Sequence, residues 1–193
     1  MTAAGYARVL LAFGMQRGIK LLYSGRNERL IHRRQPNAPQ AGRSVWPWIA
    51  AVNIGLFTLP AIERWRRRRP PPRLIAAVGW VSALAAVGLR LSVLATLREA
   101  WNVRALVPRD LHVIDRGPYR WIRHPNYVAL GLEFLGLPLI GGAYRSAIGL
   151  SAANAWLLRQ RIAEEDALLM SIPAYRERMG EKPALIPRLF SAR

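Results

Sequence analysis

Residues 117–143 read GPYRWIRHPNYVALGLEFLGLPLIGGA, so a polar stretch runs directly into an apolar one. The polar part, residues 117–127, contains one of only three histidines in the chain, together with arginines and aromatic residues. Pro118 and Pro125 make it a poor helix interior, because proline lacks an N–H and restricts the preceding residue to extended geometry. The sequence therefore predicts a rigid cationic loop, suited to a charged cofactor, at the mouth of a hydrophobic segment.

Two apolar segments follow this loop, at residues 127–143 and 146–158, with a short turn between them. Together they predict a tight helical hairpin. Glu133 is the only acidic residue inside it. An ionisable group at membrane depth is by default a functional hypothesis with a partner. The candidate partner is Arg90, which lies inside an earlier apolar segment. The alternative interpretation is that Arg90 extends its charged end to the membrane interface instead of pairing with Glu133.

The pattern at residues 151–170 stays helical up to Pro173, and it changes from apolar to charged along its length. It predicts a helix that leaves the bilayer and continues into water. Asn154, Arg161 and Glu165 are spaced by seven and four residues, so they share one helix face. One interpretation is an ordinary exposed ion pair, worth ~0.3 kcal/mol. The functional interpretation is favoured, because Asn154 continues the polar stripe into apolar sequence.

The composition indicates a small membrane protein. The chain has 193 residues and is 52% apolar, yet its formal net charge is +18. These values conflict for a small soluble protein but agree for an integral membrane protein with arginine-rich loops. The arginines fall between apolar segments rather than along one surface, which argues against a nucleic-acid partner. There is no cysteine, and the histidines lack metal-ligand spacing, so we expect no disulfide and no metal.

The first half of the chain adds further helices. Segments 45–62 and 74–97 are long and apolar enough to be predicted as membrane spans. Segment 6–23 is interrupted by charges. It either spans the membrane or lies in the interface, and we expect an ordered helix packed on the others. Residues 64–73 contain six arginines around three prolines, which favours a loop that faces lipid head groups.

These observations predict an all-α protein, an integral membrane helical bundle with about five transmembrane helices, a helical hairpin and a C-terminal helix extension in the cytoplasm. Residues 1–193 form a single domain, with N-terminal helices at 1–97 and a cofactor-binding and catalytic half at 98–193. The basic residues of the 117–127 loop and of the Arg161 helix place both in the cytoplasm, in a bacterial inner membrane. The arginine-rich loop 64–73 then lies outside the membrane, against the positive-inside tendency. We take the orientation that most of the basic loops favour.

Two motifs separated by one apolar hairpin resemble the isoprenylcysteine carboxyl methyltransferase family. The resemblance covers about residues 88–179 and rests on Gly117-Pro118-Tyr119, on Arg123-His124-Pro125-Asn126-Tyr127, and on Arg161 with Glu164-Glu165. The members are integral membrane enzymes that use S-adenosylmethionine. Within the family the chain is similar to bacterial members found beside type III polyketide synthases, through Leu89-Arg90, Trp101-Asn102-x-Arg104 and Asn27-Glu28.

The resemblance implies roles for individual residues. It implies that one set encloses the cofactor S-adenosylmethionine: Gly117, Tyr119, Arg123, His124, Pro125, Tyr127 and Glu164. It implies that Arg161 and Glu165 lie near the methyl acceptor as catalytic residues. Leu111 stands where eukaryotic prenylcysteine enzymes carry a histidine, with His112 beside it. This departure argues against His112 as a ligand and weakens the prenylcysteine interpretation. The resemblance to the bacterial members implies a ring hydroxyl of an alkylpyrone or alkylresorcinol, and the prenylcysteine carboxylate stays the other possible acceptor.

The expected function is thus S-adenosylmethionine-dependent O-methyl transfer to a lipophilic small molecule from the bilayer, with membrane lipids as surroundings. One alternative is an NADPH-dependent membrane reductase of the sterol-reductase type, which shares the Arg-His-Pro-Asn-Tyr loop but resembles this chain only up to Tyr127. The other alternative is a non-enzymatic basic membrane protein that binds anionic lipid.

Overall fold

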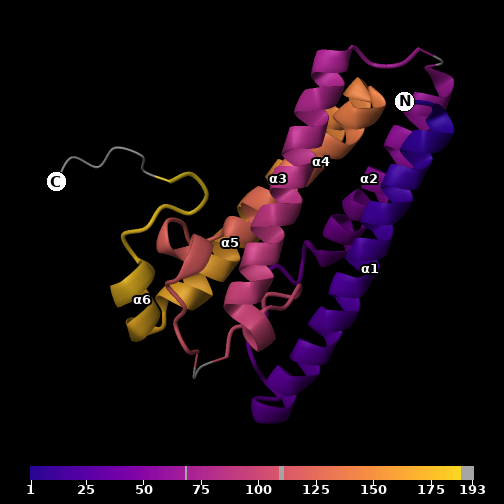
Figure 1. The fold of residues 1–193 in the computed structure, drawn as a ribbon. Coiled ribbons are helices and arrows are strands. Elements are labelled where there is room, and N and C mark those ends of the chain that lie inside the picture. Colours follow the sequence, from indigo (N-terminus) through magenta and orange to yellow (C-terminus); the bar gives the residue numbers. More distant parts are fainter. Residues whose placement is uncertain (68, 109–110, 188–193) are drawn as a thin grey trace, which may run out of the picture.

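A computed structural model describes residues 1–67, 69–108 and 111–187. Within these residues the chain is all-helical, as the sequence predicts, and contains no β-strand; one isolated antiparallel bridge joins Gln40 to Leu106. The long helices are α1 (Ala3–Arg34), α2 (Trp46–Arg66), α3 (Arg73–Leu97), α4 (Pro125–Gly141) and α5 (Tyr144–Met170). The short elements are α6 (Pro173–Met179) and two 3-10 helices, η1 (Arg98–Ala100) and η2 (Gly117–Arg120). Figure 1 shows their arrangement.

The predicted hairpin is α4 followed by α5. Pro125 occupies the first turn of α4. Backbone N–H groups there have no partner within the helix, so the missing N–H of proline costs no hydrogen bond. Gly142 closes α4 in the left-handed conformation, with φ of 73°, which glycine adopts without a steric cost. The turn between α4 and α5 is shorter than the sequence predicted, because Tyr144 already belongs to α5. As predicted, α5 continues unbroken from the hairpin into the charged segment that ends before Pro173.

Helix α1 packs on the rest of the bundle, as expected. Tyr6 is almost fully buried and donates a hydrogen bond from its hydroxyl to the carbonyl of Leu137 at 2.9 Å. Its ring lies against Gly141, where a Cβ atom would come within 2.4 Å of it. The helix also continues beyond the predicted segment 6–23 and ends at Arg34. Asn27 explains the extension, because its buried side chain donates hydrogen bonds to carbonyls of the α3–α4 connection.

The closest helix packing is between α3 and α4, which lie side by side in Figure 1. A Cβ atom on Gly136 would lie 2.7 Å from the backbone nitrogen of Ala83 and 2.8 Å from the carbonyl oxygen of Gly79. A Cβ atom on Gly79 would lie 2.6 Å from the backbone nitrogen of Ile140. Small residues at such crossings let two backbones approach, which is how helices associate where no hydrophobic effect drives them.

The number of membrane spans does not follow from the helices taken singly. Among the described residues one segment, Arg73–Ala100, is long and apolar enough to cross a membrane by itself. Helix α4 has 17 residues, which corresponds to about 25 Å at 1.5 Å per residue. Charged side chains interrupt α1 and the second half of α5. The five spans therefore stay a prediction that depends on how these charges are paired.

Two ends of the bundle can be distinguished. At one end Arg64 donates to the carbonyl of Met1 at 2.9 Å, and Arg67 donates to the carbonyl of Gly142 at 3.1 Å, so the N-terminus, the α2–α3 loop and the α4–α5 turn meet there. At the other end lie the 117–124 loop, the second half of α5, and α6 (Figure 1). The loop and the α5 extension thus share one end, as predicted, and the arginine-rich loop lies at the opposite one; its residue 68 lies outside the described residues.

Candidate functional site

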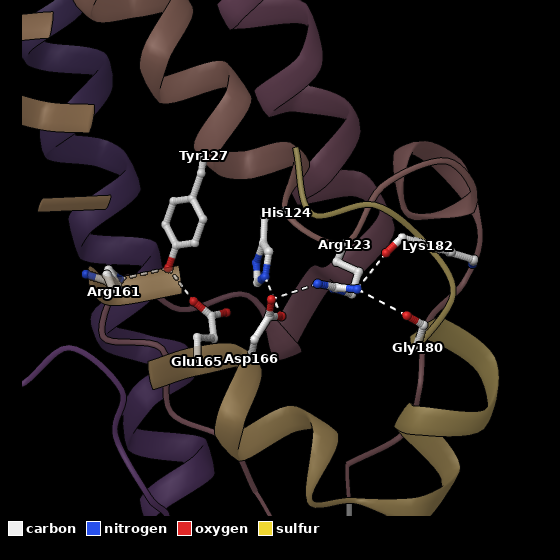
Figure 2. A network of polar contacts seen from close by, with 8 residues as sticks. All are labelled: Arg123, His124, Tyr127, Arg161, Glu165, Asp166, Gly180 and Lys182. Carbon is white, nitrogen blue, oxygen red and sulfur yellow. Dashed lines mark hydrogen bonds and ion pairs between the residues drawn. The ribbon is translucent and has the colours of Figure 1, made fainter. Parts of the chain in front are cut away.

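A polar network joins the loop before α4 to the charged half of α5 (Figure 2). Asp166 lies 2.8 Å from the Nε2 atom of His124 and accepts a hydrogen bond of 2.8 Å from the guanidinium of Arg123. Burial alone would raise the pKa of the Asp166 carboxyl, but the bonds from His124 and Arg123 outweigh it and hold this pKa below its usual range. The Asp166 carboxylate therefore stays charged and fixes both side chains of the Arg-His pair.

The C-terminal segment holds the same loop from the other side. The backbone N–H groups of Arg123 and His124 donate to the carbonyls of Pro183 and Ala184 at 3.0 and 2.9 Å. The Arg123 guanidinium donates to the carbonyl of Lys182 at 2.6 Å, as Figure 2 shows. Both terminal nitrogens of the Arg123 guanidinium are therefore bonded to protein groups, whereas its buried Nε atom has no described partner. These bonds make Arg123 a support for the loop.

A second chain of contacts links Arg161, Tyr127 and Glu165. The Nε atom of Arg161 donates to the Tyr127 hydroxyl at 2.8 Å, and this hydroxyl in turn donates to the Glu165 carboxylate. Arg161 is 4% exposed, and its guanidinium lies 5.7 Å from the ring centroids of Trp46 and Tyr127. The predicted stripe on α5 thus faces inward, and its two charged residues meet through Tyr127 instead of forming an ordinary exposed pair.

A cavity of about 130 Å³ lies between these two networks and the α3–α4 connection. We call it the polar cavity for the charged and hydroxyl groups that the two networks contribute to its wall; hydrophobic side chains line the rest of it. Six of the predicted site residues line it: Tyr119, Arg123, His124, Tyr127, Arg161 and Glu165. The structure therefore brings together the residues of the two sequence motifs, although 34 positions separate Tyr127 from Arg161 in the chain.

The remaining predicted residues lie outside the cavity wall. Gly117, with φ of 58°, packs against Thr96, whose hydroxyl oxygen would be 2.5 Å from an added Cβ atom. Pro125 starts α4. Glu164 points to the α1–α2 connection and accepts the N–H of Gly42 at 2.7 Å. These three residues shape the surroundings of the cavity without facing it.

Two residues to which the sequence analysis assigned no role in the site belong to it. Asp166 was one of several charges in the α5 extension, and no periodic rule selects it, because it lies about 100° around the helix from Glu165. Trp101 lines the polar cavity and is 3% exposed. Among the described residues its indole N–H has no hydrogen-bond partner. A buried unpartnered donor at a cavity wall is the kind of group that a ligand satisfies.

An apolar cavity of about 470 Å³ adjoins the polar one between α1, α2 and α4. Its wall includes hydrophobic side chains of three helices: Leu21, Ile49, Ile54, Phe57 and Leu130. The two cavities share Trp101, Asn126, Tyr127 and Arg161 as lining residues. The Tyr127 and Arg161 side chains therefore lie where a polar compartment meets a hydrophobic one.

A buried ion cluster lies beside the apolar cavity. Glu133 accepts from Arg17 at 2.6 Å and from Arg90 at 3.2 Å. The predicted partnership of Glu133 with Arg90 is confirmed, whereas Arg17 was missed because 116 positions separate it from Glu133. Arg90 also donates to the Asn126 side chain at 3.0 Å, which connects the cluster to the motif loop. In the described part of the chain, no group of three or more histidine or acidic side chains is placed to hold a metal ion.

Comparisons with known proteins agree with this arrangement. Residues 77–171 match the model of the Isoprenylcysteine carboxyl methyltransferase (ICMT) family. The chain is 32% identical over 160 residues to the uncharacterized protein YpbQ of Bacillus subtilis (strain 168). These 160 residues cover 80% of this chain and 90% of that protein. It is 31% identical over 113 residues to the nickel-cobalt-cadmium resistance protein NccN of Alcaligenes xylosoxydans xylosoxydans, over 57% of this chain and 53% of that protein. The chain belongs to the isoprenylcysteine carboxyl methyltransferase family, a family of integral membrane methyltransferases.

Proposed function

We propose that this protein is an S-adenosylmethionine-dependent O-methyltransferase whose acceptor is a lipophilic molecule from the bilayer. One observation carries the proposal: the hydrogen-bonded chain Arg161–Tyr127–Glu165 lies at the boundary of a polar cavity and an apolar cavity. Transfer of a methyl group from a charged donor to a hydrophobic acceptor needs two such compartments, with the reactive groups where the two meet.

The residues around the polar cavity suit such a cofactor, which supplies an electrophilic methyl group on a sulfonium. The rings of Tyr119, Tyr127 and Trp101 can face a cation. His124 can meet a hydroxyl or carboxylate group of the cofactor. Burial, with Glu165 nearby, raises the pKa of the Tyr119 hydroxyl, so it remains a neutral donor. The cavity is smaller than the ~300–1,000 Å³ usual for ligand sites, so binding must widen it.

Arg161 and Glu165 are the proposed catalytic residues. Arg161 would hold the acceptor oxygen by a charge-assisted hydrogen bond. Where the acceptor enters as a hydroxyl, Glu165 takes its proton, directly or through Tyr127. The oxygen then forms a bond to the methyl carbon as the carbon–sulfur bond breaks in line. Holding the reacting atoms in this alignment, with water excluded, can lower the barrier by ~7–11 kcal/mol.

The proposed acceptor is an alkylpyrone or alkylresorcinol hydroxyl, or the carboxyl group of a prenylcysteine. The apolar cavity next to Tyr127 and Arg161 supports a long hydrocarbon tail on any of them. A pyrone enol is already acidic and needs little help from Glu165, whereas a resorcinol hydroxyl needs more. The enzyme would therefore show different sensitivity to loss of Glu165 with the two acceptors.

The proposed topology is a bundle of five spans, α1 to α5, in a bacterial inner membrane, with the site facing the cytoplasm. Pairing of Glu133 with Arg17 and Arg90 supports it, because paired charges are far less costly in a bilayer than isolated ones. Both motifs lie at one end of the bundle, and the positive-inside tendency, which counts lysines and arginines, assigns the arginines of the 117–127 loop and of the α5 extension to the cytoplasm. The reductase alternative has no support from the comparisons, whose shared family consists of methyltransferases.

The test is methyl transfer in isolated membranes that contain the full chain. Radiolabelled S-adenosylmethionine is supplied with an alkylpyrone, an alkylresorcinol and a farnesyl-cysteine analogue in parallel. We expect label on at least one of them and its loss in Arg161→Ala and Glu165→Ala, with S-adenosylhomocysteine binding retained. Arg159→Ala, which removes an exposed arginine of the same helix, should behave as wild type. Normal turnover in both site variants would contradict the proposal.

A further inference from the structure

The charges around the apolar cavity do not balance. Four cationic side chains line it: Arg17, Lys20, Arg90 and Arg161. None of the described residues that line it is acidic. Behind this wall, Glu133 pairs with Arg17 and Arg90 and can neutralise only one of their two charges. A compartment with mostly hydrophobic walls thus carries an excess of positive charge.

Lys20 is the clearest case. It is 9% exposed, and the hydrogen bond described for its ammonium group goes to the neutral Gln16 side chain of the same helix, at 3.2 Å. The acidic neighbour of Lys20 is Glu133, which already forms ion pairs with Arg17 and Arg90. Burying an ammonium group whose charge is incompletely balanced is costly, because its lost hydration is not replaced. A bond within α1 also does nothing to fix that helix against its neighbours. A structural role therefore explains Arg17 through Glu133, but it does not explain Lys20.

The position of Lys20 connects it to the reactive residues. Ser24, one turn further along α1, accepts the N–H of Val103 at 2.8 Å, and the carbonyl of Val103 accepts a hydrogen bond from Arg161. Lys20 thus lies about one helical turn, ~6 Å along the axis, from the segment that contacts Arg161. Trp101, which stacks on Tyr23 at 6.1 Å between ring centroids, lines the same cavity with its unpartnered N–H.

We propose that Lys20 of α1 forms an anion-binding subsite that selects a methyl acceptor entering as an amphiphilic anion. The carboxylate or enolate head of this acceptor would lie near Lys20, Arg161 and the Trp101 N–H, and its tail would lie along the hydrophobic wall. This inference rests on the proposed function and narrows its substrate class. Lys20 lies outside the stretch 77–171 that matches the family, so it adds selectivity to a shared reaction centre.

The test measures binding without turnover. The purified full chain in a non-ionic detergent is titrated with a dansyl-labelled undecanoic acid and with its methyl ester, which share a tail and differ in charge. We expect the acid to bind about tenfold or more tightly than the ester, the factor expected for one charge-assisted hydrogen bond. Lys20→Gln should remove this preference and leave ester binding unchanged, whereas Lys20→Arg should keep it. Arg29→Gln, at an exposed position of α1, is the control.

Equal binding of acid and ester by the wild type would overturn the inference, as would a Lys20→Gln variant that prefers the acid. Displacement of the probe by phosphatidylglycerol, and not by phosphatidylcholine, would reassign the anion to a bilayer lipid and overturn its role as acceptor. The two proposals fail separately. Acid binding without any methyl transfer would contradict the proposed function alone, and methyl transfer without a preference for the acid would contradict this inference alone.

Discussion

Replacing Gly136 by alanine should separate α3 from α4. The added methyl group would lie 2.7 Å from the Ala83 nitrogen and 2.8 Å from the Gly79 oxygen, and both are backbone atoms that cannot rotate away. Ordinary contacts of a Cβ atom begin near 3.4 Å, so the helices must move apart by several tenths of an ångström. Overpacking of this kind costs ~1–3 kcal/mol.

Gly131→Ala is the matched control on the same helix, because a Cβ atom there would meet nothing within 4 Å. Both variants gain the ~0.5–1 kcal/mol by which alanine exceeds glycine in a helix interior. This gain cancels when the two are compared. The free energy of unfolding, measured in detergent micelles, should therefore be lower for Gly136→Ala than for Gly131→Ala by ~1–3 kcal/mol. Equal stabilities would refute the close α3–α4 crossing.

Three further outcomes are expected. Tyr127→Phe should lower the rate of methyl transfer ~10- to 100-fold, because it removes a hydroxyl bonded to two charged groups. The affinity for S-adenosylhomocysteine should change little. The control is Tyr144→Phe, which removes a buried hydroxyl without a described partner and should leave the rate of methyl transfer unchanged. Asp166→Ala should destabilise the fold by ~1–2 kcal/mol, a value reduced for the partial exposure of its contacts, and should speed amide exchange in residues 180–184; unchanged exchange would contradict the role given to Asp166. The pKa of the Asp166 carboxyl is lowered in the folded state, so its charged form stabilises the fold. The difference in melting temperature between wild type and Asp166→Ala should therefore persist above pH ~4, the ordinary aspartate pKa. It should vanish as the pH falls below this value. A difference that instead vanished near neutral pH would contradict this assignment.

The features that local chemistry dictates could be predicted from the sequence. Proline positions indicated the 117–127 loop, and the apolar runs indicated the hairpin. The spacing of Arg161 and Glu165 indicated a common face, which the structure buries. The Arg90–Glu133 pair could be named because an acid inside an apolar hairpin needs a partner.

The features that depend on tertiary contacts could not be predicted. Glu164 and Glu165 are both one turn from Arg161. Only the α1–α2 connection, whose Gly42 N–H donates to Glu164, decides that Glu165 is the one that faces the cavity. Asp166 acquires its role through a loop 42 positions away. The cationic residues that line the apolar cavity come from α1, α3 and α5, and no periodicity within one segment contains that information.

Ligand binding by the purified wild-type chain tests the central claim most directly. Calorimetric titration with S-adenosylhomocysteine should give one site per chain, and His124→Ala, which breaks the contact with Asp166 at the cavity wall, should weaken it at least about tenfold. NADPH should not bind. A folded wild-type protein that binds no S-adenosylhomocysteine, or that binds NADPH at the same site, would contradict the assignment of the polar cavity to a methyl donor.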